Sequence, residues 1–327
     1  MSDIAKDLGV STVTVSKAIT GKDGVSKTVR EKIVRRASEM GYMYNRGVRE
    51  VTLIRQHSIG VLVGEEFFND DAFYARLYQR IVLELTEQDN FGMLEIVTRE
   101  AEKQADAPGL LVNCKIDGMI LLGQMSKKYI RMLKKFDIPM VFLDFYDEEC
   151  VEDSVISDSV YGACKLTKYL IAQGHTDIGF IGSYLKTSSI LDRYIGYYKA
   201  MVQARLQVRP EWVLEDRDEE GKYLDIAFPE NMPTAFVCNC DEVAFNVIQK
   251  LKKAGYNIPQ DISVVGFDNY IHAELSSPQI TTFGVDLDMM VQKAVEIILK
   301  KVKDNTYSAG RIVVSGTLYL RKSVNKR

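Results

Sequence analysis

The stretch DIAKDLGVS, residues 3–11, and the run TVTVSKAI that follows it, residues 12–19, decide how this chain is interpreted. In the first stretch, Ile4 and Leu8 have the spacing of one apolar helix face, and Gly9 supplies a tight turn after them. Two short helices joined by a glycine turn predict a helix-turn-helix. In such a unit the second helix enters the major groove of DNA.

The second predicted helix separates its side chains into two faces. Val15, Ala18 and Ile19 are expected to point inward, which leaves these side chains exposed: Thr12, Val13, Ser16 and Lys17. Ser11 is placed to cap this helix, because its hydroxyl can accept from the first amides. A third helix is predicted over residues 27–40, with Ser26 as its cap.

Charge is distributed unevenly along the chain. Residues 1–55 hold eleven Lys and Arg against six Asp and Glu, a net charge of +5, whereas the whole chain carries −3. Residues 56–327 therefore carry −8. A basic segment on an otherwise acidic chain is typical of a nucleic-acid-binding module, although solvation of a small helical cap would require the same residue types.

Several functional classes are disfavoured by composition and motifs. The five cysteines and three histidines form no metal-ligand pattern, so we expect no metal and no cofactor. No GxGxxG follows a predicted strand, and neither a phosphate-binding GxxxxGK loop nor a GxSxG elbow occurs, so we expect no enzyme. No apolar run approaches the roughly twenty residues of a membrane span, and no signal peptide is evident. We therefore expect a cytoplasmic, nucleoid-associated protein.

From residue 58 onward, apolar strands alternate with amphipathic helices. Strands are predicted over residues 59–63, 93–97, 118–122, 140–143, 154–156, 178–181, 235–237, 263–267 and 311–319. Helices are predicted over residues 73–88, 127–136, 161–173, 193–204 and 241–254. This alternation predicts parallel sheets covered by helices, an α/β class, and the number of strands favours two lobes.

Polar residues just past strand ends are the first candidates for a ligand site, because open α/β sheets bind ligands there. Asp144, Asp241 and Asp268 each follow a predicted strand, and Arg193 begins a helix near the same cleft. The alternative for Asp241 is that it only caps the following helix.

These features together resemble the lactose-repressor family of bacterial transcription regulators. The resemblance is carried by residues 3–18 and recurs in ordered motifs: GY…N at 41–45, GH..IGFI at 174–181 and PQDISVVGFD at 259–268. It implies a helix-turn-helix domain at 1–43, a hinge helix at 44–57 and a two-lobed core at 58–327 that resembles periplasmic sugar-binding proteins. The lobe boundary is expected near 157, with further crossovers near 284 and 318.

The resemblance also assigns DNA contacts. Thr12, Val13 and Lys17 match the family's base-reading positions; Val13 suits a thymine methyl, and Lys17 can donate to guanine or to phosphate. Positions that match backbone contacts are Ser11, Thr14, Ser16, Ser26 and Asn45.

The hinge departs from the family pattern. Val51 stands where a leucine normally inserts into the minor groove, and Tyr44 replaces a usual proline. Gly47 lies inside the hinge helix, where glycine costs about 1 kcal/mol relative to alanine.

In the core, Asp144, Arg193 and Asp268 match the family's effector contacts, a set that suits a polyhydroxylated ligand. Cys240, beside Asp241, replaces the Asn or Asp that some relatives have next to the ligand. Arg217 stands where an aromatic is common; if it faces the cleft, the expected ligand shifts toward an acidic or phosphorylated sugar. Phe73 lies in an aromatic segment that either stacks on a sugar ring or packs beneath the lobe.

The family implies a repressor that binds operator DNA as a homodimer and responds to a small-molecule effector, expected to be a sugar. The tail after residue 319 has no apolar heptads, which favours a dimer over a tetramer. The alternative is that a protein corepressor replaces the free sugar, as in one branch of the family.

Overall fold

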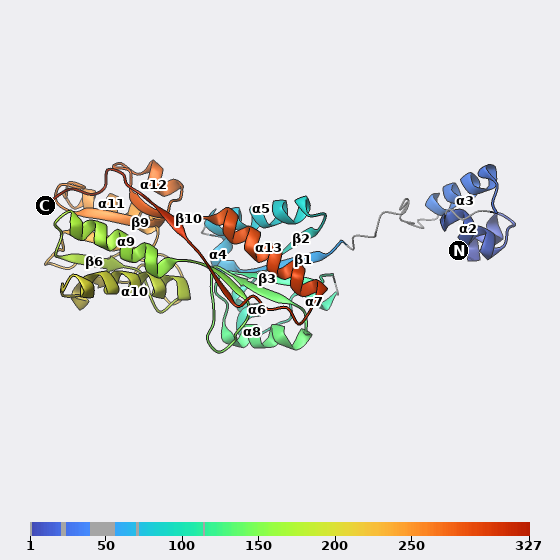
Figure 1. Cartoon of the computed structure of the whole chain (residues 1–327), viewed down its shortest axis with the longest axis horizontal. Coiled ribbons are helices and arrows are strands. Elements are labelled where there is room, and N and C mark those ends of the chain that lie inside the picture. Colours follow the sequence, from blue (N-terminus) through green and yellow to red (C-terminus); the bar gives the residue numbers. More distant parts are fainter. Residues whose placement is uncertain (1, 21–23, 40–55, 70–71, 114) are drawn as a thin grey trace. The chain divides into compact units, whose positions relative to one another are not determined.

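The computed structural model describes residues 2–20, 24–39, 56–69, 72–113 and 115–327. The chain divides into two compact units, residues 1–55 and residues 56–327 (Figure 1). Within the described residues, no helix has the length and apolarity needed to cross a membrane.

The first unit contains three helices, α1 (Ser2–Asp7), α2 (Thr12–Thr20) and α3 (Lys27–Glu39). Gly9 has a φ of +60°, the left-handed conformation that glycine adopts most readily, so the predicted turn between α1 and α2 is present. A small core holds the three helices together and consists of Ile4, Ala5, Val15, Ala18, Ile33 and Ala37. The helix-turn-helix predicted from the sequence is confirmed.

The second unit contains two lobes, each built on one six-stranded sheet. The N-lobe sheet is parallel throughout, in the order β11-β5-β4-β3-β1-β2. Its strands are β1 (Ser58–Gly64), β2 (Phe91–Val97), β3 (Gly118–Leu122), β4 (Met140–Leu143), β5 (Ser154–Ser157) and β11 (Arg311–Val314).

Helices cover both faces of the N-lobe sheet. One face packs against α4 (Glu65–Asn69), α5 (Ala72–Glu87) and α13 (Leu287–Lys303). The other packs against α6 (Arg99–Gln104), α7 (Gly109–Val112) and α8 (Lys127–Leu133), which continues into the short helix η1 (Lys134–Phe136).

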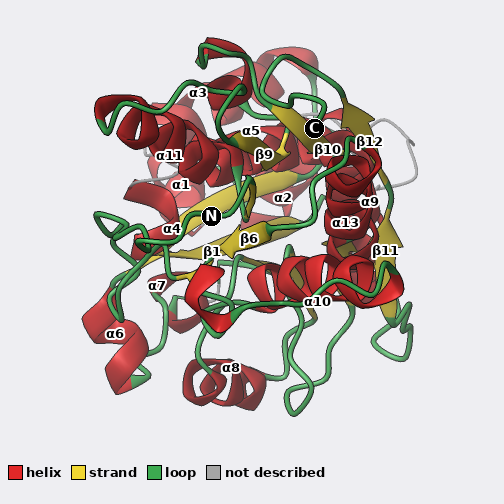
Figure 2. Cartoon of the chain, turned by 90° about the vertical axis from the view of Figure 1, so that its left-hand side faces the viewer, coloured by secondary structure: helices red, strands yellow, loops and turns green. Residues whose placement is uncertain are grey.

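The C-lobe sheet has the order β12-β10-β9-β8-β6-β7, and only β12 runs antiparallel to its neighbour. Its strands are β6 (Ile178–Ile181), β7 (Val213–Leu214), β8 (Ala235–Cys238), β9 (Ser263–Asp268), β10 (Thr281–Val285) and β12 (Gly316–Tyr319). One face carries α9 (Ser159–Ala172) and α10 (Ser188–Gln203), and the other carries α11 (Asp241–Lys253) and α12 (Ile271–Leu275). The short helix η2 (Pro210–Trp212) leads into β7. Strands thus lie between helical layers (Figure 2), and the predicted α/β class is confirmed.

The chain passes between the two sheets three times: after β5, after β10, and at Ser315 between β11 and β12. The sequence predicts the third crossing near 318 and one strand over 311–319. The structure instead divides that segment between the two sheets. Gly316 makes this possible, because a Cβ there would lie 2.2 Å from the carbonyl oxygen of Gly284.

Several helices differ from the sequence prediction: α4, α6, α7, α12 and α13 were not predicted, and α10 begins earlier than expected. The helix that contains Arg193 begins at Ser188, so Arg193 lies in its second turn rather than at its start. The seventeen-residue helix α13 is not among the predicted helices, and it returns a late part of the chain to the N-lobe core.

Candidate functional site

The second helix of the first unit presents its predicted surface to solvent. The Ser11 hydroxyl accepts from the backbone N–H of Thr14 at 3.0 Å and lies 2.8 Å from the Thr14 hydroxyl, so Ser11 caps α2. Val13 is 62% exposed, which is unusual for valine and leaves its methyl groups free to contact a partner. Thr12 and Lys17 are exposed beside it, and Ser16 is half-buried.

The turn before α3 is held in a similar way. The Ser26 hydroxyl accepts from the N–H of Val29 at 3.4 Å, and Asp7 of α1 pairs with Arg36 of α3. The Asp7–Arg36 pair joins α1 to α3, and α2 packs against both through the small core. The predicted contacts Asn45 and Val51 lie outside the described residues.

The core places the strand-end residues at the facing edges of its two sheets. Arg193 of α10 is buried, and its guanidinium donates to the carbonyl oxygen of Asn239 at 2.6 Å and to the Asp268 carboxylate at 2.9 Å. The same guanidinium lies over the Phe267 ring, 4.1 Å from its centroid. Its Nε is buried and has no partner among the described residues.

The carboxylate of Asp144 acts on Arg193 from the other lobe. Asp144 follows β4, has a φ of +68°, and accepts a hydrogen bond from the Tyr74 hydroxyl at 2.9 Å. Burial opposes the charge on Arg193, but the carboxylates of Asp268 and Asp144 outweigh it and raise the pKa of the guanidinium. Arg193 therefore stays charged in a position where both lobes contribute carboxylates.

Arg217 is committed to a neighbour that the sequence prediction did not include. Its Nε and Nη2 both donate to one oxygen of Asp216, at 3.1 and 3.0 Å, and its guanidinium lies 4.9 Å from the Tyr223 ring centroid. Asp216 is buried and also accepts from the N–H of Ser183 and the amide of Asn239. Two of the five N–H donors of Arg217 are therefore used on Asp216, and its charge is paired within the protein.

Cys240 and Asp241, at the start of α11, have different roles. Burial raises the pKa of the Cys240 thiol, which remains neutral despite the nearby Arg217. Asp241 is the first residue of α11, and its carboxylate accepts from the N–H of Tyr270 at 2.7 Å rather than capping its own helix. The alternative of a simple helix cap at Asp241 is therefore wrong.

The aromatic segment was predicted either to stack on a ligand or to pack beneath the lobe, and Phe73 and Tyr74 differ in this respect. Phe73 is 6% exposed and belongs to the N-lobe core, where it packs edge-on against Tyr74 with the ring centroids 5.4 Å apart. It is Tyr74 that reaches Asp144. The sequence signal for Tyr74 was its place directly after Phe73, one residue further along α5.

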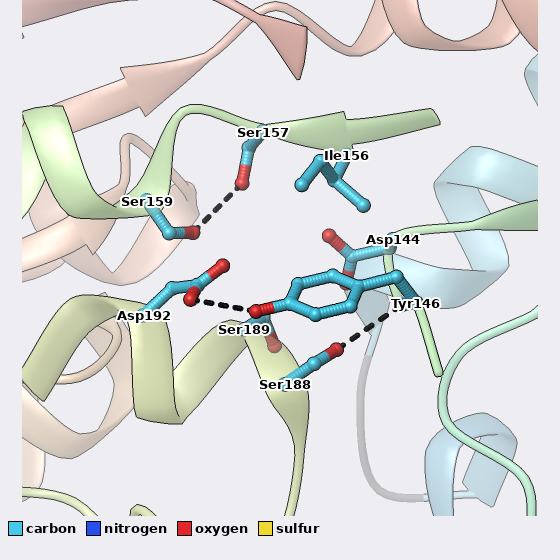
Figure 3. A pocket seen from close by; sticks show the side chains of 8 residues that line it. All are labelled: Asp144, Tyr146, Ile156, Ser157, Ser159, Ser188, Ser189 and Asp192. Atoms are coloured by element: carbon cyan, nitrogen blue, oxygen red, sulfur yellow. Dashed lines mark hydrogen bonds between the residues drawn. The ribbon is translucent and has the colours of Figure 1, made fainter. Parts of the chain in front are cut away.

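A small polar pocket adjoins Asp144 and joins the two lobes (Figure 3). Tyr146, after β4, donates from its hydroxyl to Asp192 of α10 at 3.0 Å, and its backbone N–H donates to the Ser188 hydroxyl at 3.2 Å. Burial and Asp192 together raise the pKa of Tyr146 to about 12. The cavity volume open to a water-sized sphere is about 0 Å³, against roughly 300 Å³ or more for a typical small-molecule site, so the pocket is closed to a ligand in this lobe arrangement. Its lining is Asp144, Tyr146, Ile156, Ser157, Ser159, Ser188, Ser189 and Asp192.

No group of three or more His, Cys, Asp or Glu side chains in the described part of the chain is arranged to hold a metal ion. Cys238 and Cys240, two residues apart, are both free thiols. The chemistry that the cleft offers is hydrogen bonding from one buried guanidinium and to several carboxylates.

Comparison with known proteins gives this arrangement a family. Residues 1–45 match the model for bacterial regulatory proteins of the lacI family, and residues 167–324 match a periplasmic binding protein-like domain. The HTH-type transcriptional repressor PurR of Vibrio campbellii is 30% identical over 332 residues, covering 100% of this chain and 98% of that protein. The chain belongs to the lacI family.

Solved structures of lacI-family regulators show the same architecture. A complex of the transcriptional regulator CelR with cellobiose is 25% identical with a TM-score of 0.72, covering 98% of both chains. A lac repressor dimer bound to operator and the anti-inducer ONPF is 21% identical with a TM-score of 0.73, covering 99% of this chain and 98% of that one. The protein is thus a DNA-binding transcriptional regulator and not an enzyme, as the sequence predicted.

Proposed function

We propose that the protein is a repressor that binds operator DNA as a homodimer, and that a neutral polyhydroxylated effector, a sugar, bound between its lobes sets its operator affinity. One observation carries the effector part of this proposal. The buried Arg193 donates a hydrogen bond to Asp268 and interacts electrostatically with Asp144 of the opposite lobe. Its Nε–H has no partner among the described residues. Carboxylates that accept and a guanidinium that donates are the groups that bind adjacent sugar hydroxyls.

The charge balance supports a neutral ligand rather than an acidic one. Arg217 is already paired with Asp216, so the cation that would favour a phosphorylated sugar is neutralised within the protein. Around the two guanidiniums stand three carboxylates, those of Asp144, Asp216 and Asp268. A ligand carboxylate or phosphate would approach an excess of like charge, which costs binding energy. The cellobiose bound in the CelR structure is itself a neutral sugar, and this supports the same assignment.

The DNA part of the proposal rests on the first unit and on the lac repressor structure, in which a dimer is bound to operator. Val13 and Lys17 are exposed on one face of α2. A two-fold dimer places two such helices on the DNA, so we expect a roughly palindromic operator.

Lobe movement links the two sites in this proposal. The chain crosses between the lobes three times, and the proposed effector residues come from both lobes. A ligand that contacts both lobes stabilises one lobe arrangement over another, and it changes operator affinity only as far as its affinity differs between them.

The test begins with in vitro selection of duplexes by the full-length protein, followed by fluorescence anisotropy on the selected site. Ribose, glucose, cellobiose, glucose 6-phosphate and gluconate are then titrated by calorimetry and in the DNA assay. We expect a neutral sugar to bind and to shift operator affinity. Arg193→Lys should weaken the affinity for that sugar by about tenfold or more, because the point charge of an ammonium replaces a planar guanidinium. Arg131→Lys, at an exposed position on α8, is the control.

Tight binding of only the acidic sugars would overturn the neutral-ligand assignment and leave the regulator intact. Specific DNA binding that no small molecule alters would favour a protein corepressor. In the DNA assay, Lys17→Ala should reduce the slope of log K against log salt by about one if Lys17 contacts phosphate. Val13→Ala should instead weaken binding to the selected site more than binding to sites with base substitutions. Lys103→Ala, which changes an exposed lysine of residues 56–327, is the control for Lys17→Ala.

A further inference from the structure

The outer face of the α9–α10 layer exposes apolar and basic side chains together. We call it the α9–α10 surface. It consists of Tyr161, Lys165 and Lys168 of α9 and Ile195, Tyr198, Lys199 and Val202 of α10. Ile195, Tyr198 and Val202 are 43%, 49% and 54% exposed. A contiguous group of exposed large apolar side chains on a helix marks an interaction site more often than single exposed residues do.

The apolar residues of α10 follow a regular spacing. The half-buried Leu191 is followed by Ile195, Tyr198 and Val202, at intervals of four, three and four. This is the spacing of a helix–helix seam, in which apolar residues repeat every 3.5 positions. The opposite side of α10 already packs into the C-lobe core through Tyr197, Ala200 and Met201 among others.

α10 is therefore apolar on two sides. Close packing against α9 accounts for the inner side: a Cβ on Gly196 would lie 2.3 Å from the carbonyl oxygen of Val160. Among the residues that the structure describes, nothing covers the outer side, where Ile195, Tyr198 and Val202 stay exposed. A row of exposed large apolar side chains on one side of a helix is suited to a second partner.

The charges on this surface have one sign. Residues 159–205 contain six Lys and Arg against two Asp, in a chain whose net charge is −3. The single acidic residue of α9 and α10 is Asp192, which is buried and accepts from Tyr146. The exposed charged residues of the two helices are Lys165, Lys168 and Lys199. A partner that covers the apolar seam therefore gains from carboxylates at its edges.

A second copy of this chain does not fit that requirement. Two α9–α10 surfaces face to face would bring lysines toward lysines. The C-lobe also has apolar side chains on the other face of its sheet, where Ile271 and Leu275 of α12 are 50% and 68% exposed. A dimer formed through α12 would leave the α9–α10 surface free.

We propose that the α9–α10 surface docks an amphipathic helix of a partner protein, one with an apolar row flanked by Asp and Glu. The apolar seam would supply most of the affinity, and the lysines would select for acidic partners. Such a partner would bind the C-lobe without occupying the effector cleft.

The test uses two synthetic helical peptides and the full-length protein. Both peptides carry leucines at heptad spacing; one has Glu at the flanking positions and the other has Lys. By fluorescence anisotropy we expect the Glu peptide to bind, to weaken as salt rises, and to bind at least about tenfold more tightly than the Lys peptide. Ile195→Ser should weaken the affinity for the Glu peptide by about tenfold. Lys199→Glu should reduce the preference between the two peptides.

The matched control is Val112→Ser, which removes an exposed aliphatic side chain from α7 of the N-lobe, 62% exposed against 43% for Ile195, and should leave peptide binding unchanged. Operator binding of each variant checks its fold. Equal binding of both peptides, or binding that Ile195→Ser does not alter, would overturn the proposal. Binding of phosphatidylserine vesicles by the protein, when neither peptide binds, would also overturn the proposal. A change of oligomeric state in Ile195→Ser, seen by sedimentation, would overturn it in favour of a second copy.

Discussion

A buried carboxyl group in the C-lobe shows how environment changes a single residue. Asp241 is 1% exposed, and burial together with the nearby carboxylate of Asp268 raises its pKa well above the ordinary value. The hydrogen bond that its carboxylate accepts from the N–H of Tyr270 favours the charged form, but it does not offset burial. A raised pKa means that the folded protein holds this proton more tightly than the unfolded chain does, so folding is favoured at low pH.

We predict that Asp241→Asn stabilises the protein at neutral pH by on the order of 1 kcal/mol or more, because asparagine keeps the acceptor for Tyr270 without the buried charge. The sign follows from the raised pKa. Wild-type stability is lost as pH rises from about 4, where the unfolded carboxyl titrates, through the folded pKa. The gap between variant and wild type should therefore close as the pH is lowered. Urea unfolding at several pH values measures it.

The exposed carboxylate of Asp225, on the same lobe, provides the control. Asp225→Asn should follow the wild type closely at every pH. If Asp241→Asn also followed the wild type at every pH, burial would not be the main cause of a raised Asp241 pKa.

At the scale of secondary-structure elements, the contact between α9 and α10 is set by small residues. Gly196 of α10 lies against the backbone of α9, and Gly162 of α9 in turn approaches the rings of Phe283 and Phe267. Neither glycine is required by a positive φ. Both are required by close approach, which brings α9 and α10 into one layer over the sheet.

We predict that Gly196→Ala destabilises the core by about 1–3 kcal/mol, because the added methyl group overpacks the contact with Val160 and Ala163. Helix propensity alone predicts the opposite, a gain of about 1 kcal/mol. Urea unfolding separates the two expectations by sign. Lys199→Ala, at an exposed position on the same helix, should be close to neutral, and a stabilised Gly196→Ala would show that the helices can move apart without cost.

At the scale of the whole core, the two lobes are held together by direct hydrogen bonds as well as by the three chain crossings. Tyr146 bonds Asp192 and Ser188 across the lobes, and the amide oxygen of Gln124 accepts from the N–H of Ser188 at 3.2 Å. Arg311 lies over the Tyr146 ring, 3.5 Å from its centroid, and belongs to β11 beside a crossing. The lobe arrangement therefore has a contact that needs no effector.

We predict that Tyr146→Phe shifts the lobes toward a more open arrangement. The change removes the hydroxyl donor and leaves the buried Asp192 without it, a loss of about 1–3 kcal/mol. Small-angle scattering without effector should show a larger radius of gyration, and effector affinity should fall by about three- to tenfold or more, because closing the lobes then costs part of the binding energy. Tyr198→Phe, with an exposed hydroxyl, should change neither quantity. An unchanged radius and affinity in Tyr146→Phe would show that the crossings alone set the lobe arrangement.

Local sequence was sufficient for the features that depend on local interactions. The helix-turn-helix follows from apolar spacing, the turn at Gly9 and the cap at Ser11, all within a few residues of one another. The alternation of strands and helices gave the α/β class for the same reason: burial of a strand or helix face leaves a period in the sequence. Asp144 and Asp268 could be predicted as candidates because each directly follows an apolar strand, and open parallel sheets bind ligands at the carboxyl ends of their strands.

Only the tertiary structure decided the features that join distant parts of the chain. Tyr74 and Asp144 are 70 positions apart and meet because α5 packs on the N-lobe sheet. Helix α13 and β11 return to the N-lobe before β12 completes the C-lobe sheet, so residues 311–319, which have one continuous strand pattern, are divided between two sheets. The pairing of Arg217 with Asp216 likewise depends on how Ser183 and Asn239 surround that carboxylate. Periodicity reports which face of an element is buried, but not what it is buried against, and that second choice is made by the packing of the whole molecule.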